Sequence, residues 1–150
     1  MKTPITQQLI EQANKALSEA DPEKLIELFE LGKRSIEEPA GKWMDGKEIA
    51  PGISTMPHYF LNDVAGRIMT ILYELNLIVS FDWMEWQEGK ELLSNDNLEK
   101  LTGKPAHMLV GLLTALARND RFCDGAWGSA VEKGSIAKLL SELEKRTNGE

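Results

Sequence analysis

The stretch that decides the fold is residues 57–78, PHYFLNDVAGRIMTILYELNLI. Its apolar residues recur at steps of three and four, the period of one helix face; they are Phe60, Val64, Ile68, Ile71, Leu75 and Ile78. Leu61, Met69 and Leu72 widen this face, and a helix that is apolar around most of its circumference belongs at the centre of a bundle. The pattern therefore predicts a buried helix from Pro57 to Ile78.

Two shorter helices are expected before this stretch. Thr3-Pro4 and Asp21-Pro22 each place a capping residue before a proline at the first helical position. Gly32 is a natural stop for the second helix. The sequence therefore predicts an antiparallel helical hairpin over residues 1–35.

A segment rich in proline and glycine, residues 38–56, separates this hairpin from the central helix. Residues of these types at such density forbid a long helix; they are Pro39, Gly41, Gly46, Pro51 and Gly52. Connections of this length in compact domains are usually functional or disordered. Trp43 and Ile49 favour packing onto the body, as a lid or a short strand pair, with a turn at Asp45-Gly46.

The remaining residues complete a helical core over residues 57–146. Asp82 is expected to cap a helix that carries Trp83 and Trp86, and Asp96 with Glu99 matches the spacing of a capping box. Further helices are expected after Pro105, at 126–133 and from Ser135 onward. The whole pattern predicts an all-α fold: one compact bundle of about six to eight helices over residues 1–150, with one long Pro/Gly-rich insertion.

The composition limits the classes of partner. The net charge of −7 argues against duplex nucleic acid and anionic lipid, which both require clustered lysine and arginine. The most apolar stretch, residues 68–81, is too short and too interrupted to span a bilayer. One cysteine and no secretory signal favour a cytoplasmic protein.

The residues do not form a recognisable catalytic set. The sequence therefore favours a non-enzymatic protein without excluding an enzyme. His58 and His107 lack metal-ligand spacing, and neither a metal nor a cofactor is predicted. Cys123 has no adjacent histidine or lysine to activate it, which favours a buried or half-buried structural cysteine.

One acidic segment supports an alternative. Asp82, Glu85, Glu88 and Glu91 follow each other at steps of three. Glu85 and Glu88 match half of the magnesium motif of all-helical nucleotide pyrophosphohydrolases, whose second half, Glu-x-x-Asp, is not found on another helix. A solvated face is favoured over a metal site.

The segment Arg118-Asn119-Asp120-Arg121-Phe122-Cys123-Asp124-Gly125 is the most distinctive. The pattern predicts a corner between two helices. Arg118 is expected at a helix C-terminus, Asp120 is expected to pair with an arginine, and Asp124 is expected to cap the next helix. The alternative is a site where Arg118 and Arg121 bind an anion or a partner, with Asp120 as a further candidate contact residue. Trp83 and Trp86, beside Asp82, are core anchors or ligand-contacting residues.

At these residues the chain resembles a family of small microbial proteins known only as a domain of unknown function. The matching pieces are Phe81-Asp82-Trp83 with Trp86, Leu112 to Leu116, and Arg118-x-Asp120-Arg121-Phe122-x-x-Gly125. The resemblance covers about residues 63–146 and leaves out the first two helices and the insertion. It implies a helical fold and no activity.

The residues therefore favour a small non-enzymatic protein that acts by binding a protein partner or a second copy of itself. The magnesium-dependent hydrolase at Glu85 and Glu88 and the anion or small-ligand site at Arg118 and Arg121 remain as alternatives.

Overall fold

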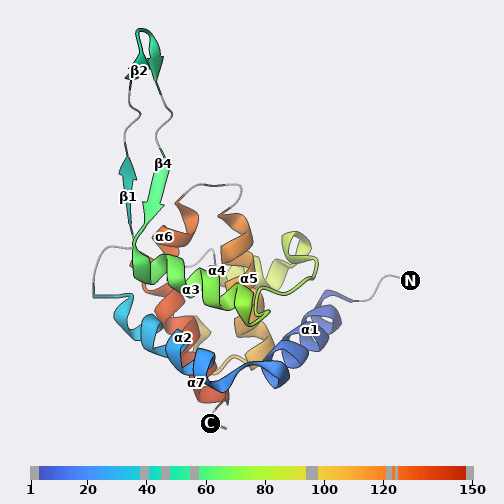
Figure 1. The fold of residues 1–150 in the computed structure, drawn as a ribbon. Helices are drawn as coiled ribbons and strands as arrows, with labels where there is room; N and C mark the ends of the chain where they lie inside the picture. The colour runs from blue at the N-terminus through green and yellow to red at the C-terminus, as the bar shows by residue number, and fades with distance from the viewer. Residues whose placement is uncertain are drawn as a thin grey trace.

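The computed structural model describes residues 4–37, 41–44, 48–54, 58–93, 98–120, 123 and 125–147. These residues form seven α-helices, two short 3-10 helices and four short strands. The helices pack around one apolar core, and the strands project from it as a narrow ribbon (Figure 1). The predicted all-α bundle with one long insertion is confirmed.

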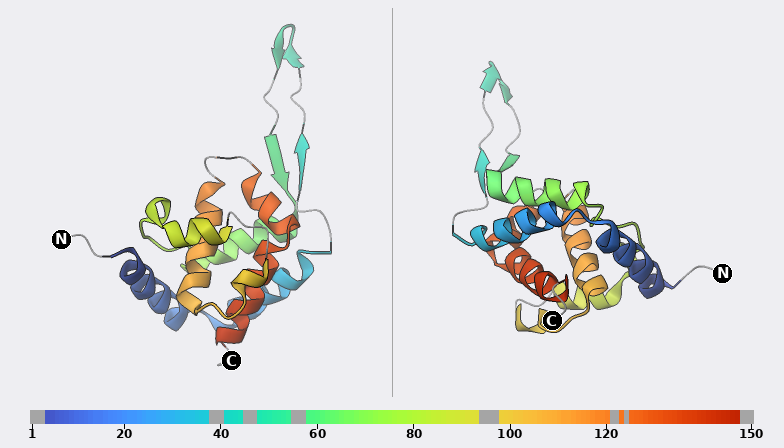
Figure 2. Two further views of the ribbon diagram at one scale, coloured as in Figure 1. Left: turned by 180° about the vertical axis from the view of Figure 1, so that it is seen from behind. Right: turned by 60° about the horizontal axis from the view of Figure 1, so that its bottom comes forward.

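The first two helices are α1 (Ile5–Glu19) and α2 (Pro22–Arg34). The predicted start of α2 is confirmed, because the Asp21 carboxylate accepts the Glu23 backbone N–H at 3.1 Å. The pair differs from the expected hairpin: α1 packs mainly on α5, whereas α2 packs on α3 and α7. The two helices diverge from the turn between them (Figure 2).

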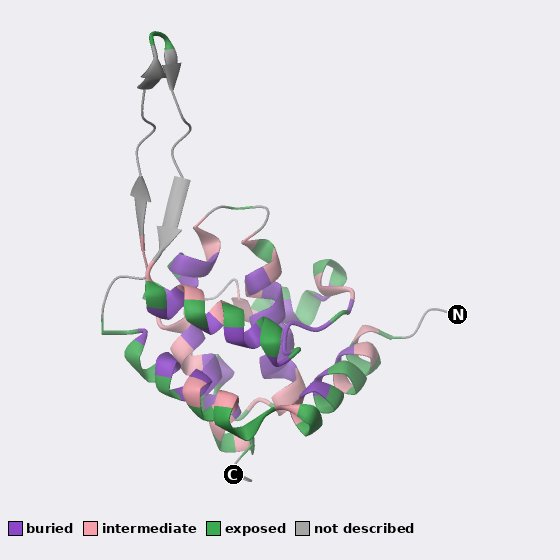
Figure 3. Ribbon diagram, viewed as in Figure 1, coloured by how far each residue is buried: buried purple, intermediate pink, exposed green. Residues whose placement is uncertain are grey.

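The buried centre is α5 (Ala106–Asn119), which packs against α1, α4, α6 and α7. Residues 108–115 are all buried. The helix that the sequence places at the centre, α3 (Asp63–Glu74), instead lies at the edge with one face exposed (Figure 3). Its exposed residues include Arg67, Thr70 and Tyr73.

The predicted helix over residues 57–78 divides into three parts. Residues 58–61 form a strand, and α3 begins after Asn62, whose side-chain oxygen accepts the Ala65 N–H at 2.8 Å. The helix ends at Glu74, and Asn76 adopts a left-handed conformation with φ of 59°. Residues 77–79 continue as a buried segment outside any helix.

The insertion forms four strands: β1 (Gly41–Met44), β2 (Glu48–Ala50), β3 (Ile53–Ser54) and β4 (His58–Leu61). We call these four strands the arm. β1 pairs with β4 and β2 with β3, both antiparallel, and exposed Pro51 and Gly52 connect β2 to β3, with Gly52 at φ of 77°. A strand pair is present, but it extends away from the helices rather than packing onto them (Figures 1 and 2). The predicted turn at Asp45-Gly46 lies outside the described residues.

The other elements are the 3-10 helices η1 (Trp83–Glu85) and η2 (Leu98–Leu101), and the helices α4 (Gln87–Leu93), α6 (Ala126–Glu132) and α7 (Ser135–Thr147). Gly134, with φ of 85°, separates α6 from α7. The Asp96 of the predicted capping box lies outside the described residues. Among the helices described, none is long and apolar enough to cross a bilayer.

Candidate functional site

The corner between α5 and α6 is held by Asp120. Its carboxylate accepts the backbone N–H of Trp127 at 3.0 Å, in the first turn of α6. Asp120 therefore caps the first turn of α6. Asp124, which the sequence predicts as the cap of this helix, lies outside the described residues together with Arg121 and Phe122. Arg118 is half-buried, and its side chain makes no hydrogen bond or ion pair with the described part of the chain.

Trp127 connects this corner to α3. Its ring is fully buried, and its Nε1 donates to the Ala65 carbonyl at 3.0 Å. Asp120 and Trp127 thus join three helices, which is a structural role. Cys123 is exposed, so the expectation of a buried or half-buried cysteine is wrong.

The residues around η1 have different roles. Trp86 is buried, and its ring meets the Phe81 ring edge-on, with centroids 5.3 Å apart. Asp82 contacts α1: its N–H donates to Gln8 Oε1 at 3.3 Å, and its carboxylate accepts from Gln8 Nε2 at 3.5 Å. Its side chain makes no cap hydrogen bond to η1. Trp83 is half-buried at the surface.

The acidic residues after Asp82 face solvent. Glu85, Glu88 and Glu91 are all exposed. Within the described ranges, no three histidine, cysteine or acidic residues come together as metal ligands would. The geometry thus brings no third carboxylate to Glu85 and Glu88 among those residues.

Two adjoining hollows lie on the surface between α4, α5 and α6, and they share Leu93 and Leu116 as lining residues. The first hollow, of about 380 Å³, lies beside Trp83, Trp86, Gly89, Lys90, Ala115 and Asn119. The second, of about 320 Å³, lies beside Leu98, Ala126, Ser129, Ala130, Lys133 and Ser135. We call both together the α4–α5 groove.

The sequence points to only part of this groove. Trp83 and Trp86 are among the predicted candidates, and they do line it, whereas Arg118 and Asp120 are not among its lining residues. Leu93 and Leu116 belong to ordinary helical apolar patterns, and Lys133 looks like a solvated charge. Nothing in the sequence around these three residues shows that they line the same surface groove.

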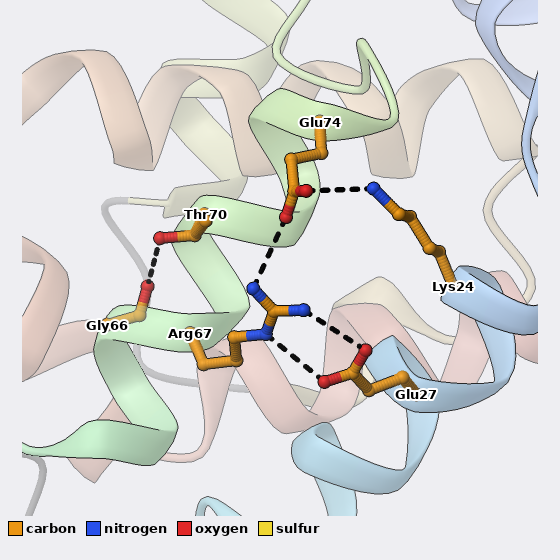
Figure 4. A network of polar contacts seen from close by, with 6 residues as sticks. All are labelled: Lys24, Glu27, Gly66, Arg67, Thr70 and Glu74. Atoms are coloured by element: carbon orange, nitrogen blue, oxygen red, sulfur yellow. Dashed lines mark hydrogen bonds and ion pairs between the residues drawn. The ribbon is translucent and has the colours of Figure 1, made fainter.

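Two charged clusters hold helices together. Lys24 and Glu27 of α2 bond Glu74 and Arg67 of α3, at distances of 2.8 to 3.3 Å (Figure 4). The hydrogen bond from Lys24 lowers the pKa of Glu74, and the hydrogen bond with Glu27 raises the pKa of Arg67. Arg67 thus bridges two helices, although its spacing from Asp63 would allow an intrahelical pair.

The second cluster surrounds Glu142 of α7, whose side chain is only 1% exposed. Its carboxylate accepts the Gly103 backbone N–H at 3.0 Å, and Lys145 and Arg146 approach it at 3.1 and 3.3 Å. The hydrogen bond from Gly103 is the largest cause of its lowered pKa, with Lys145 adding to it. The cluster attaches the loop before α5 to α7 and leaves no free acid for chemistry.

Comparison with protein families then identifies the chain. The model of DUF6508, described as a family of unknown function, matches residues 20–149. The chain belongs to DUF6508. The match includes α2 and the arm, so the range of residues 63–146 inferred from sequence is too short for the DUF6508 region. No curated protein and no solved structure matches the chain.

Proposed function

We propose that this protein is a non-enzymatic association module, and that two copies bind each other through their arms. The observation that carries the proposal is the arm itself: two antiparallel strand pairs that extend away from the helical body (Figures 1 and 2). A two-stranded ribbon is at best marginally stable alone in water. An extension of this kind therefore gains stability when another surface covers it.

The backbone of the arm supports pairing with another strand. Each pair is a two-stranded sheet within the described part of the chain, so both of its edges carry backbone groups available to a further strand. Strand addition at such an edge is a common mode of recognition. A second copy presents the same edge, and a two-fold axis makes the contact self-complementary.

The charge of the arm also fits this role. Residues 41–61 contain two lysines, one aspartate and one glutamate, so they are formally neutral in a chain of net charge −7. They are also rich in apolar and aromatic residue types, including Trp43, Ile53 and Phe60. Two arms can therefore meet without the repulsion that the acidic bodies would exert on each other.

The other functions considered have weaker support. Glu85 and Glu88 are exposed and meet no third metal-ligating residue in the described ranges. Of the two arginines proposed for an anion, Arg118 lies at the end of α5 and Arg121 lies outside the described residues. Neither observation favours a catalytic or anion-binding function.

The test removes the arm and preserves the body. Gly41 and Leu61 are paired in the register of β1 and β4, so an Asn-Gly turn can replace residues 42–60 and connect them. We expect the full chain to sediment as a concentration-dependent dimer. The arm-closed variant should be a monomer with unchanged helical circular dichroism.

A matched control places a polar residue on the body. Ile26 of α2 is 62% exposed and lies outside the arm, so Ile26→Ser should leave the dimer unchanged. If the full chain sediments as a monomer at its highest soluble concentration, or if the arm-closed variant still dimerises, self-association through the arm is wrong.

A further inference from the structure

The α4–α5 groove lies on the helical body and requires no residue of the arm. Each hollow has a volume within the usual range for small-molecule pockets, about 300–1,000 Å³. Because Leu93 and Leu116 line both hollows, the two adjoin at this leucine pair. The groove can thus receive one elongated molecule that lies across both leucines.

The two ends of the groove differ in polarity. Beyond the leucine pair, the first hollow is lined mainly by apolar residues, with Lys90 and Asn119 as its polar lining residues; the others are Trp83, Trp86, Gly89 and Ala115. The second hollow contains Ser129, Lys133 and Ser135, two hydroxyls and an ammonium from α6, its C-terminal end and the first residue of α7. An apolar body fits the first hollow, and a polar head group fits the second.

The charge of the groove has one sign. Its charged lining residues in the described part of the chain are Lys90 and Lys133, although acidic residues outnumber basic ones by 24 to 17 overall. Neither lysine makes an ion pair with the described residues, whereas Lys24, Lys138 and Lys145 each pair with a glutamate. The groove therefore offers two uncommitted cations to an anionic ligand.

We propose that the α4–α5 groove binds a monocarboxylate with an extended apolar body, of the medium-chain fatty acid class. The carboxylate lies at Lys133, where Ser129 and Ser135 can donate hydrogen bonds. The chain crosses Leu93 and Leu116 and ends against Trp83. A neutral apolar molecule leaves Lys133 unused, and an inorganic anion leaves the apolar hollow unfilled.

The binding experiment uses decanoate and decanol as probes, titrated by calorimetry into the full chain, with tryptophan fluorescence as a second readout of binding. We expect one decanoate per chain, bound at least tenfold more tightly than decanol. From octanoate to decanoate the affinity should rise about fourfold per added CH₂.

Substitutions then test the head-group position. Lys133→Met should weaken decanoate about tenfold or more and leave decanol unchanged, since it removes the charge but keeps the apolar stem. Lys133→Arg should restore most of the affinity. Lys100→Met, an exposed lysine of η2 outside both hollows, is the matched control and should bind decanoate like the parent.

Three results would overturn the proposal. They are the absence of saturable decanoate binding, equal affinities for decanoate and decanol, and an unchanged decanoate affinity in Lys133→Met. The arm-closed variant should bind decanoate as the full chain does, so failure of self-association and failure of the groove are separate outcomes. Unchanged circular dichroism in each variant shows that a lost affinity is not a lost fold.

Discussion

Thr114 lies in the middle of α5, and its hydroxyl connects this helix to a segment 35 residues earlier in the chain. Thr114 Oγ1 accepts the Val79 N–H at 3.1 Å and donates to the Leu77 carbonyl at 3.2 Å. The side chain is fully buried. Buried backbone groups outside regular structure require partners, and this one hydroxyl satisfies two of them.

Thr114→Val keeps the shape of the side chain and removes both hydrogen bonds. We expect it to lower the free energy of unfolding by about 1–3 kcal/mol, because a buried N–H and a carbonyl lose their partner. Thr114→Ser keeps the hydroxyl and is the matched control. Hydrogen exchange at the Val79 amide should accelerate in the valine variant alone. Equal stability of Thr114→Val and the parent would contradict the role given to the hydroxyl.

Glu142 makes stability depend on pH. Its pKa is lowered mainly by the Gly103 N–H, so its contribution is complete above the ordinary glutamate value of 4.5 and is lost as pH falls through the lowered folded-state pKa. Glu142→Gln should cost about 1.5–3 kcal/mol at neutral pH. The difference in unfolding free energy between Glu142→Gln and the parent should shrink as the pH falls below 4.5. Chemical denaturation at several pH values can measure this.

The neighbouring acid provides the control for Glu142. Glu144 of the same helix is part of a long ion pair, 3.7 Å from Lys33 Nζ. Exposed pairs of this kind contribute little, so Glu144→Gln should leave stability nearly unchanged at every pH. If both glutamine variants show the same pH dependence, the cluster around Glu142 is not its source.

Some single-residue roles could be read from the sequence and others could not. The cap at Asp21 was predictable because a cap and the N–H it accepts are two residues apart. Thr114, Trp127 and Glu142 each also have a partner 35 to 62 residues away, and no local pattern encodes such a contact. The same limit hides the α4–α5 groove, whose leucine pair comes from two helices.

At the scale of elements, the apolar spacing of residues 57–78 is real, but it crosses two changes of backbone conformation. Asn62 starts α3 by capping it, and Asn76 ends it by adopting a positive φ. Ile78 lies beyond the end of α3 and is nevertheless buried. It therefore fits the apolar pattern although it is not part of a helix. Burial sets the pattern, and the two asparagines set the helix boundaries.

Glycines within helices let other elements approach closely. A Cβ at Gly111 of α5 would lie 2.7 Å from Leu9 Cδ2 and 2.8 Å from Trp86 Cη2. Trp86 is also held against Gly89 and Phe81, so it cannot move aside freely. This contact positions α1 and η1 on α5, and it places Trp86 at the wall of the groove.

Gly111→Ala should therefore lower the free energy of unfolding by about 1–3 kcal/mol, despite the better helix propensity of alanine. Gly32→Ala in α2 is the matched control, since its Cβ would meet only Leu140, with the end of that side chain 2.9 Å away. The Leu140 Cβ, 3.2 Å away, can move only with its backbone, so the control should lose some stability, but less than Gly111→Ala, where the Trp86 ring must also move. Comparable losses in both variants would contradict the role of the Trp86 contact.

At the scale of the whole molecule, the protein combines an acidic helical body with a neutral arm. The insertion was predictable from its prolines and glycines, but its direction was not, because no local rule says whether a ribbon folds back. The DUF6508 match spans both the arm and most of the body. The family definition therefore includes the arm together with the body that carries it.

This distribution of charge predicts how salt affects self-association. Two bodies of net charge −7 repel each other, and screening shortens that repulsion from about 10 Å at 0.1 M salt to about 3 Å at 1 M. If two copies associate through their arms as proposed, the dimer should therefore tighten several-fold between these salt concentrations, as sedimentation equilibrium can measure. The arm-closed variant should stay monomeric throughout. Dissociation of the full chain by salt would contradict this prediction, because it would mean that ion pairs between the copies outweigh the repulsion between their bodies.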